Sequence, residues 1–337
     1  MSLIAKHHAS LVELTQQLSA PFFFYDLDAC MAHVSYLSAP GLKLWYAVKA
    51  NPLSAVIRCM HQAGLECDVA SVGELQQVLA HAIPVNRVLN TGPAKSKQHL
   101  QQMLDAGVRI FVVESIQQAQ DLNALVGQRQ CKVQVLLRVQ LTWQQQGQEK
   151  NVLGGCALTP FGLTPADWLQ FNTTDYANLS ICGLHIFQWG NILDAGDLSR
   201  IWQIMIPQLQ DLAAQLSIPL DILDLGGGLG IPYADELPLA WSDVQQQLEQ
   251  IRQQLPQTEI WMELGRYAIG PFGCYLCQVV DRKINNGQQQ LVLEGGVNHL
   301  LRPALTSQPF RFHYCEIAKS MCQNSFCMGH CVLVWII

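Results

Sequence analysis

Residues 43–52 read Lys-Leu-Trp-Tyr-Ala-Val-Lys-Ala-Asn-Pro, and this stretch decides the fold prediction. The apolar and aromatic run Lys43–Val48 predicts a buried strand, which Asn51-Pro52 ends. Lys49 is then a single lysine at the carboxyl end of that strand. Burial favours the neutral amine of a lysine, and the neutral amine is the form that condenses with a carbonyl compound. Because a strand-end lysine often extends to solvent instead, Lys49 alone leaves both roles open.

Strand-like and helix-like segments alternate along the chain after Lys49. Further strands are expected at Glu66–Ala70, Arg87–Thr91, Val108–Val113, Cys131–Val139, Leu179–Phe187, Leu220–Leu225 and Glu259–Glu263, and helices at Val72–His81, Ser96–Ala106, Ile116–Val126, Leu198–Leu216 and Trp241–Leu255. With Lys43–Val48 these make eight short strands rich in Val, Ile and Leu, as strands buried on both faces are. The sequence therefore predicts an α/β fold, a closed (β/α)8 TIM-type barrel, whose active site lies at the carboxyl ends of the strands.

Three more of these strands carry reactive or ligand-binding residues at that end. The sixth carries His185, and the seventh runs into Gly226-Gly227-Gly228, whose backbone N–H groups can hold a phosphate. The eighth ends in Glu263 and is followed by Arg266. Taken singly, a core histidine, a glycine turn or a surface carboxylate is an ordinary feature. Because all of them occur at one end of one barrel with Lys49, they predict a common site.

The same residues belong to motifs with a familiar order. The motifs are Ala47–Asn51, Asp68–Ser71 with Gly73-Glu74, Thr91–Ser96, Phe161–Leu163, Gly183–His185, Leu225–Gly228 and Glu263–Arg266. Between roughly Pro21 and Leu305 the chain thus resembles the pyridoxal-phosphate-dependent decarboxylases of the alanine-racemase-like barrel fold, which act on ornithine, arginine and diaminopimelate. The resemblance implies pyridoxal 5'-phosphate as cofactor and loss of CO2 from a small amino acid, with the diaminopimelate type the nearest label. A homologue that binds but has lost its chemistry, or an amino-acid racemase, remains an alternative.

The resemblance also implies roles for individual residues. Lys49 would hold the cofactor covalently, His185 would lie flat against the pyridine ring, and Glu263 would keep the pyridine nitrogen protonated. The racemases of this fold place an arginine at that nitrogen, so Glu263 favours decarboxylation. The phosphate would be bound by Gly226, Gly227, Gly228 and Arg266, with Asp68 and Ser71 near the cofactor. No metal site is expected.

Two departures from the family pattern follow His185. Trp189-Gly190 stands where relatives have a Gly-Ser pair, so the hydrogen bond from that serine to the cofactor is absent or replaced. Phe187 replaces the second histidine of the diaminopimelate-type pattern. The pocket therefore resembles those of relatives from specialised natural-product or siderophore pathways.

Four segments are expected along the chain. Residues 1–30 would form a helix and strand associated with a β-domain, residues 31–268 the barrel, residues 269–312 a partial β-domain, and residues 313–337 an aberrant Cys-rich tail. The tail lacks the aspartate and the alternating strand pattern expected there, and the family's cysteine–aspartate pair and late tyrosine have no match after Phe312. We therefore expect low turnover despite cofactor binding, and a weakened form of the family homodimer.

Composition narrows the class of protein further. A net charge of -6 gives no basic surface, which argues against a nucleic-acid partner. No stretch reaches the roughly eighteen apolar residues of a membrane span. The twelve cysteines, scattered through apolar segments, indicate buried thiols in a reducing compartment. We expect a cytoplasmic enzyme with a small-molecule substrate.

Overall fold

The computed structural model describes residues 3–142, 159–233, 235–306, 312–316 and 330–334. The chain divides into two compact units. One contains Met31–Gly230 and Pro238–Ala268, and the other contains Met1–Cys30, Ile231–Leu237 and Ile269–Ile337. All the predicted site residues belong to the first unit.

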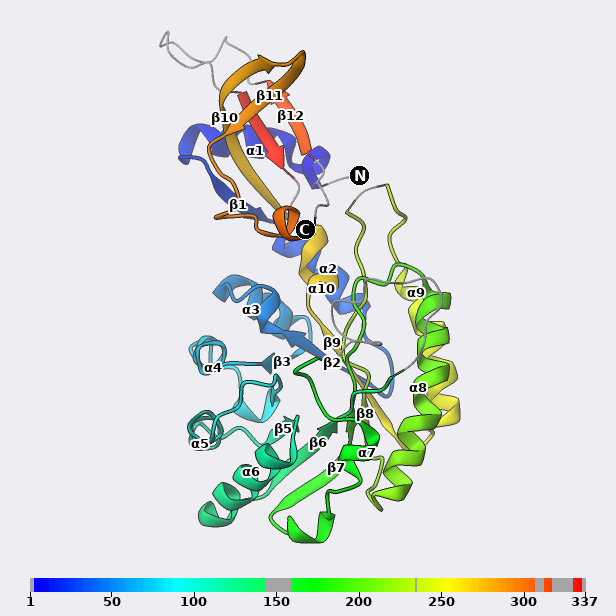
Figure 1. The fold of residues 1–337 in the computed structure, drawn as a ribbon. Helices are drawn as coiled ribbons and strands as arrows, with labels where there is room; N and C mark the ends of the chain where they lie inside the picture. Colours follow the sequence, from blue (N-terminus) through cyan, green and yellow to red (C-terminus); the bar gives the residue numbers. More distant parts are fainter. Residues whose placement is uncertain (1–2, 143–158, 234, 307–311, 317–329, 335–337) are drawn as a thin grey trace. The chain divides into compact units, whose positions relative to one another are not determined.

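The first unit is a closed barrel of eight parallel strands, β2 to β9, in the order of the sequence (Figure 1). The strands are β2 (Leu42–Ala47), β3 (Glu66–Val69), β4 (Val88–Asn90), β5 (Ile110–Val113), β6 (Val133–Arg138), β7 (Leu179–His185), β8 (Ile222–Asp224) and β9 (Glu259–Leu264). β9 pairs with β2 and closes the ring. The TIM-type barrel predicted from the alternation is therefore confirmed.

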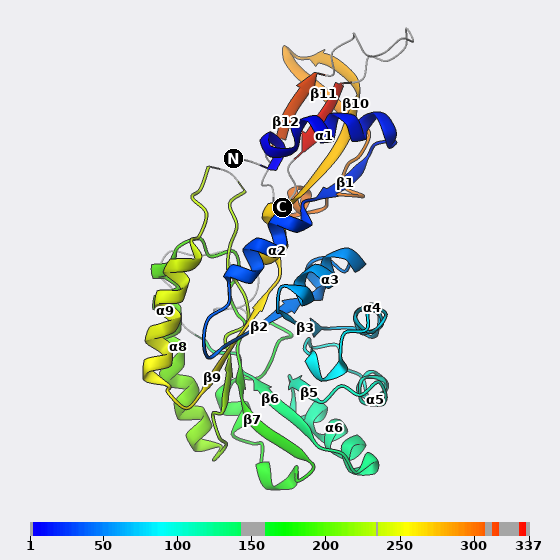
Figure 2. The same ribbon diagram turned by 180° about the vertical axis from the view of Figure 1, so that it is seen from behind.

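Helices follow the strands and surround them, as Figures 1 and 2 show. They are α3 (Ser54–Gln62), α4 (Val72–Leu79), α5 (Lys97–Asp105), α6 (Ile116–Arg129), α7 (Pro165–Trp168), α8 (Ala195–Gln215), α9 (Trp241–Gln254) and α10 (Arg266–Ile269), with α2 (Leu27–Tyr36) before the first barrel strand. Three successive helices begin after a serine whose hydroxyl accepts a backbone N–H: Ser71, Ser96 and Ser115. Such caps satisfy helix donors that would otherwise lack a partner.

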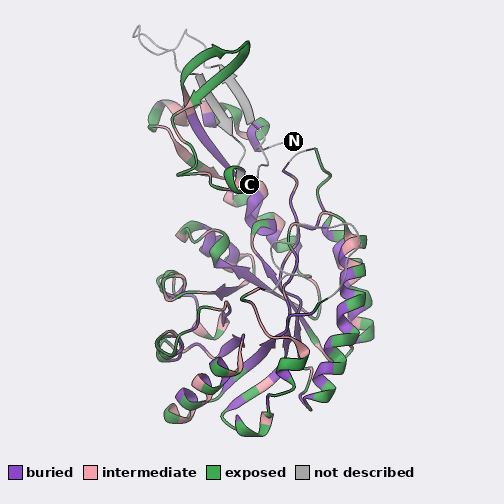
Figure 3. Cartoon of the chain, in the orientation of Figure 1, coloured by how far each residue is buried: buried purple, intermediate pink, exposed green. Residues whose placement is uncertain are grey.

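The interior of the barrel is apolar and tightly filled. One buried cluster takes side chains from strands around the ring: Trp45, Leu89, Ile110, Val112, Leu136, Cys182, Ile222 and Trp261. The rings of Trp45 and Trp261 lie 4.9 Å apart across the β2–β9 pair. Figure 3 shows that the strands are buried, whereas the surrounding helices have exposed outer faces. The packed interior leaves the strand ends as the place for chemistry.

The second unit is built around an antiparallel sheet. Its elements are α1 (Leu3–Gln17), β1 (Phe22–Tyr25), β10 (Gly273–Asn285), β11 (Gln288–Leu293), α11 (Arg302–Thr306), β12 (Phe312–Glu316) and β13 (His330–Val334). The long strand β10 pairs with β1, β11 and β13, and β13 pairs with β12. Leu3, Ile4 and Leu11 of α1 pack with Cys274 and Leu276 of β10.

Strands form at the carboxyl-terminal end of the described residues, although residues 313–337 lack an alternating strand pattern. β12 and β13 pair antiparallel, with Phe312 opposite Val334 at one end and Glu316 opposite His330 at the other. The apolar, β-branched run Cys331–Val334 suits a strand, although it lacks the alternation on which the prediction relied. Residues 317–329 and 335–337, with Cys322 and Cys327, lie outside the described residues.

Among the described residues, no helix is both long enough and apolar enough to cross a membrane.

Candidate active site

Lys49 and Asp68 lie beside each other at the carboxyl ends of adjacent strands. Lys49 follows β2 in a short 3-10 helix (Val48–Ala50), and Asp68 lies on β3. The parallel register pairs Ala47 with Asp68, and the Lys49 Nζ lies 3.4 Å from the Asp68 Oδ2. The Thr91 hydroxyl donates a hydrogen bond to the other oxygen of Asp68. Since the Asp68 side chain is 1% exposed and that of Lys49 48%, the carboxylate is fixed in the barrel wall while the amine stays accessible.

The pKa of Lys49 is raised above its ordinary value. Asp68 contributes most to this rise in the pKa, burial opposes it, and Glu263 adds to it. The expectation that burial leaves the Lys49 amine neutral was therefore wrong. A carboxylate at this distance favours the ammonium form, and its effect on the pKa of Lys49 exceeds that of burial.

Glu263 and His185 form a buried pair in the same site. Glu263 lies on β9 and His185 ends β7, and the His185 Nε2 is 3.0 Å from the Glu263 Oε1. Burial raises the pKa of Glu263, but His185, Lys49 and Arg138 outweigh burial and lower the pKa to about 2. Burial lowers the pKa of His185 in spite of Glu263. The imidazole and the carboxylate therefore form a buried hydrogen-bonded pair, in which a carboxylate can only accept from the His185 Nε2–H.

Asp224 ends β8 and directs its carboxylate back to the glycine run. Its Oδ1 accepts the Gly226 N–H at 2.8 Å, whereas its buried Oδ2 has no hydrogen-bond partner. Burial, followed by the charge of Glu263, raises the pKa of Asp224 well above its ordinary value. A buried carboxylate oxygen without a partner costs folding free energy, and such costs are typical of functional positions.

The glycine run cannot carry side chains. Gly226 and Gly228 have φ values of +64° and +97°, which favour glycine. A Cβ on Gly226 would lie 2.5 Å from the Phe187 Cβ, and one on Gly228 would lie 2.3 Å from the Trp189 Cδ1. The Glu263 N–H donates to the Gly226 carbonyl at 2.8 Å, so the glycine run and Glu263 belong to one site.

A second buried cluster of charges lies at neighbouring strand ends and was missed in the sequence. The Arg138 Nη1, at the end of β6, is 3.0 Å from the Oε1 of Glu114, which follows β5. The Nζ of the fully buried Lys95 side chain is 4.0 Å from the same oxygen. Burial, opposed by Glu114, lowers the pKa of Lys95 to about 8. A signal did exist, because Glu114 and Arg138 lie at the carboxyl ends of predicted strands, as Lys49 does.

Ser71 and Arg266 lie at the beginnings of helices. The Ser71 hydroxyl accepts the Glu74 N–H at 3.2 Å, while the Glu74 carboxylate accepts the Ala70 N–H at 2.8 Å. The two bonds resemble a capping box at the start of α4, except that Glu74 accepts from Ala70 and not from the N-cap Ser71. Arg266 is exposed and begins α10 directly after β9. The predicted cofactor contacts of both residues remain predictions.

The geometry fits a phosphorylated aromatic aldehyde. A Cβ on any glycine of the run would collide with Phe187, Trp189 or the Glu263 backbone, so its backbone stays free of side chains. The buried His185 Nδ1 and Asp224 Oδ2 have no partner of their own. Carboxylates at this site suit a protonated ring nitrogen, and Lys49 supplies an accessible amine. The ligand atoms of His185, Asp224 and Glu263 also lie within 4.8 Å of one another, close enough to bind a metal ion. The expectation that the protein has no metal site therefore remains a prediction.

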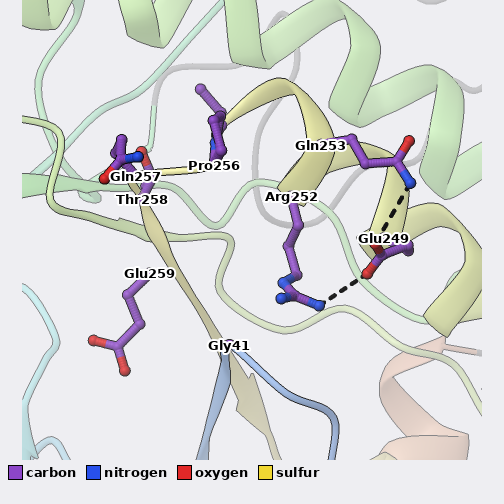
Figure 4. A pocket seen from close by; sticks show the side chains of 9 residues that line it. Gly41, Glu249, Arg252, Gln253, Pro256, Gln257, Thr258 and Glu259 are labelled. Carbon is purple, nitrogen blue, oxygen red and sulfur yellow. Dashed lines mark hydrogen bonds and ion pairs between the residues drawn. The ribbon is translucent and has the colours of Figure 1, made fainter.

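A separate pocket of about 500 Å³ lies at the opposite end of the strands (Figure 4). Its lining includes Gly41, which precedes β2, and Glu259, which begins β9. Arg252 and Glu249 of α9 form an ion pair of 2.8 Å in its wall. None of the predicted site residues lines it.

Residues 31–270 match the family described as pyridoxal-dependent decarboxylase, pyridoxal binding domain. The chain belongs to this family of pyridoxal-phosphate-dependent decarboxylases.

Several characterised relatives are similar over most of the chain. The diaminopimelate decarboxylase of Bacteroides thetaiotaomicron is 26% identical over 304 residues, which cover 87% of this chain and 78% of that protein. The L-glutamyl-(BtrI acyl-carrier protein) decarboxylase of Niallia circulans is 23% identical, with 91% and 74% covered. The crystal structure of Helicobacter pylori diaminopimelate decarboxylase complexed with L-lysine has the same fold, with a TM-score of 0.83, 21% identity, and 96% and 87% covered.

Asp68→Asn is expected to lower the pKa of Lys49, because the carboxylate contributes most to the increase. We expect a decrease of about one pH unit, the lower end of the range for a nearby charge, since Lys49 is half-exposed. The measurement is the pH dependence of Lys49 acetylation, followed by mass spectrometry in the absence of cofactor. Glu66→Gln is the matched control, because Glu66 also lies on β3 and pairs with Lys43 instead. An Asp68→Asn midpoint equal to that of the wild type would contradict the assignment.

Asp224→Asn is expected to stabilise the protein above about pH 4. The raised pKa of Asp224 means that its ionisation destabilises the folded state once the pH exceeds the ordinary value of 3.8. The gain from asparagine should be absent near pH 4 and grow towards pH 8, by at most about 1.4 kcal/mol per pH unit. Urea unfolding at several pH values measures it. Asp221→Asn, at an exposed position before β8, should show no such trend, and a less stable Asp224→Asn variant at pH 8 would refute the prediction.

Proposed function

We propose that this chain is a pyridoxal-phosphate-dependent amino-acid decarboxylase of the diaminopimelate type, with Lys49, His185 and Glu263 as catalytic residues. The observation that carries the proposal is the Glu263 carboxylate, which is buried, ionised and hydrogen-bonded to His185 at 3.0 Å. A buried anion supports a protonated pyridine nitrogen, and a protonated ring favours decarboxylation over racemisation in this fold. The names of the relatives agree with this reaction class.

The residues at the strand ends divide the work of holding the cofactor. Lys49 binds its aldehyde, and Asp68, 3.4 Å away, positions the lysine amine. Gly226, Gly227 and Gly228 bind the phosphate through backbone N–H groups, with Arg266 as an additional cation and Ser71 nearby. When bound, pyridoxal phosphate withdraws the electrons that remain on the α-carbon of the substrate after CO2 leaves.

The protein side chains control protons and orientation around that step. Glu263 holds a proton on the ring nitrogen, because an adjacent anion raises the pKa of a cation. His185, held by its hydrogen bond to Glu263, would restrict the orientation of the ring. Asp68 accepts a hydrogen bond from the Lys49 ammonium, so this pair would hold a proton at the Lys49 Nζ whenever the amine is free.

The substrate and the assembly are the finer parts of the proposal. A small amino acid with a distal polar group is proposed from the relatives, and a homodimer in the cytoplasm from the family resemblance. The motif differences in residues 313–337 support low turnover with cofactor binding intact. Cofactor capture is therefore the first property to measure, and release of CO2 the second.

The cofactor is expected on Lys49. Incubation with pyridoxal phosphate, reduction with borohydride and peptide mapping should place the label there, and Lys49→Arg should remove it. Lys95 is the internal comparison, because its pKa is lowered to about 8 but its side chain is fully buried. A label on Lys95, or none at saturating cofactor, would eliminate the assignment.

Glu263→Gln is expected to retain cofactor binding and to lose turnover. Removing one member of a buried ion pair costs roughly 3–5 kcal/mol, which corresponds to at least about a hundredfold in rate. The assay is release of CO2 from diaminopimelate, lysine, ornithine and arginine. Glu249→Gln, on the outer helix α9, is the matched control. If the wild-type chain retains its cofactor but releases CO2 from none of these, the decarboxylase proposal fails and the binding-homologue alternative holds.

A further inference from the structure

We propose that the indole N–H of Trp189 is a phosphate-binding donor of this site, in place of the serine that relatives carry after the strand of His185. The proposal rests on the proposed function, since it assigns a contact to the same cofactor. It makes Trp189 a residue that distinguishes phosphorylated from unphosphorylated ligands.

Two connections hold the segment that carries Trp189 in place. The Gln188 side chain donates to the Leu141 carbonyl and accepts the Leu141 N–H, each at 2.7 Å. The Ile192 N–H donates to the Gly228 carbonyl at 2.9 Å, and the Gly230 N–H donates to the Ile192 carbonyl at 2.8 Å. The Trp189 segment is therefore bound on one side to the end of the barrel wall and on the other to the glycine run. Little freedom remains for the ring between them.

The ring of Trp189 lies directly against the predicted phosphate cradle. A Cβ on Gly228 would lie 2.3 Å from the Trp189 Cδ1 and 2.6 Å from its Nε1, so the polar edge of the indole faces Gly228. The ring of Phe187 meets that of Trp189 edge-on, with centroids 6.4 Å apart and an interplanar angle of 88°. Phe187 also lies against Gly226 and Gly227, so the two aromatic side chains pack along the same glycine run.

The Nε1 of Trp189 has no hydrogen-bond partner, although the residue is only 1% exposed. An indole nitrogen can only donate, and a buried donor without an acceptor destabilises the fold. Buried indole nitrogens without a partner also occur at Trp45 and Trp261 in the barrel interior and at Trp202 and Trp241 on α8 and α9. Of these five indoles, that of Trp189 is the one found among the atoms nearest to a Cβ on the glycine run. The position beside a glycine cradle is what gives the Trp189 donor an acceptor, the phosphate oxygen.

The test compares two ligands that differ only by the phosphate. Equilibrium dissociation constants of pyridoxal phosphate and pyridoxal are measured by absorbance for the wild type, Trp189→Phe and Trp202→Phe. Phenylalanine keeps an aromatic ring but removes the donor, and Trp202→Phe controls for the loss of a buried tryptophan. A hydrogen bond to a charged group is worth about tenfold or more in affinity. We expect Trp189→Phe to weaken the binding of pyridoxal phosphate by about tenfold and that of pyridoxal by less than twofold. Trp202→Phe should change neither dissociation constant.

A second readout does not depend on attachment of the cofactor. In the Lys49→Ala variant labelled with 15N at tryptophan indoles, inorganic phosphate should shift one indole resonance, and Trp189→Phe should remove that resonance. Equal weakening of both ligands would show that Trp189 has only a structural role. Unchanged or tighter binding of pyridoxal phosphate would show that the indole is uninvolved or obstructs the cradle, and either result overturns the proposal. If the wild type binds no pyridoxal phosphate, the proposed function fails, whereas a phosphate-induced shift would still support the Trp189 donor.

Discussion

The parallel pairing of β2 with β9 is the constraint on which the site depends. The two strands come from the beginning and the end of the barrel sequence, and their register pairs Trp45 with Glu263 and Tyr46 with Leu264. Closure therefore places Lys49, just beyond β2, next to the strand that carries Glu263. The contact between the Trp45 and Trp261 rings packs the interior under the same pair of strands. Without this pairing the sheet would be open, and the lysine and the carboxylate would lie at its opposite edges.

The site concentrates negative charge around one accessible amine. Asp68, Asp224 and Glu263 are all buried, and burial opposes the ionisation of each. Within the protein, Asp68 pairs with Lys49 and Glu263 accepts the Nε2–H of His185, whereas the raised pKa of Asp224 favours its protonated form. Such an arrangement is poor for stability but well suited to a ligand with a protonated nitrogen. The acidic groups at this site therefore lower the stability of the fold, and this cost indicates that they serve ligand binding.

Much of the fold could be predicted from the sequence because apolar strands and capped helices alternate regularly. Lys49, His185 and Glu263 were found because each ends or lies on such a strand. The raised pKa of Lys49 was not predictable, since it depends on Asp68, whose proximity follows from strand register. The Lys95, Glu114 and Arg138 cluster was missed for a similar reason, because its members become neighbours through the pairing of β4, β5 and β6. Strands β12 and β13 were missed because their pairing partner β10, and not their own alternation, specifies them.

The contact between the aromatic segment and the glycine run has a consequence for the evolution of the site. Phe187 occupies the space that a Cβ on Gly226 would need, and Trp189 occupies that beside Gly228. The backbone hydrogen bonds of Ile192 with Gly228 and Gly230 join the two segments along their length. Neither segment can change size or path while the other stays fixed. In related sequences we therefore expect residues 187–192 and 226–230 to be inherited as one unit and to diverge together.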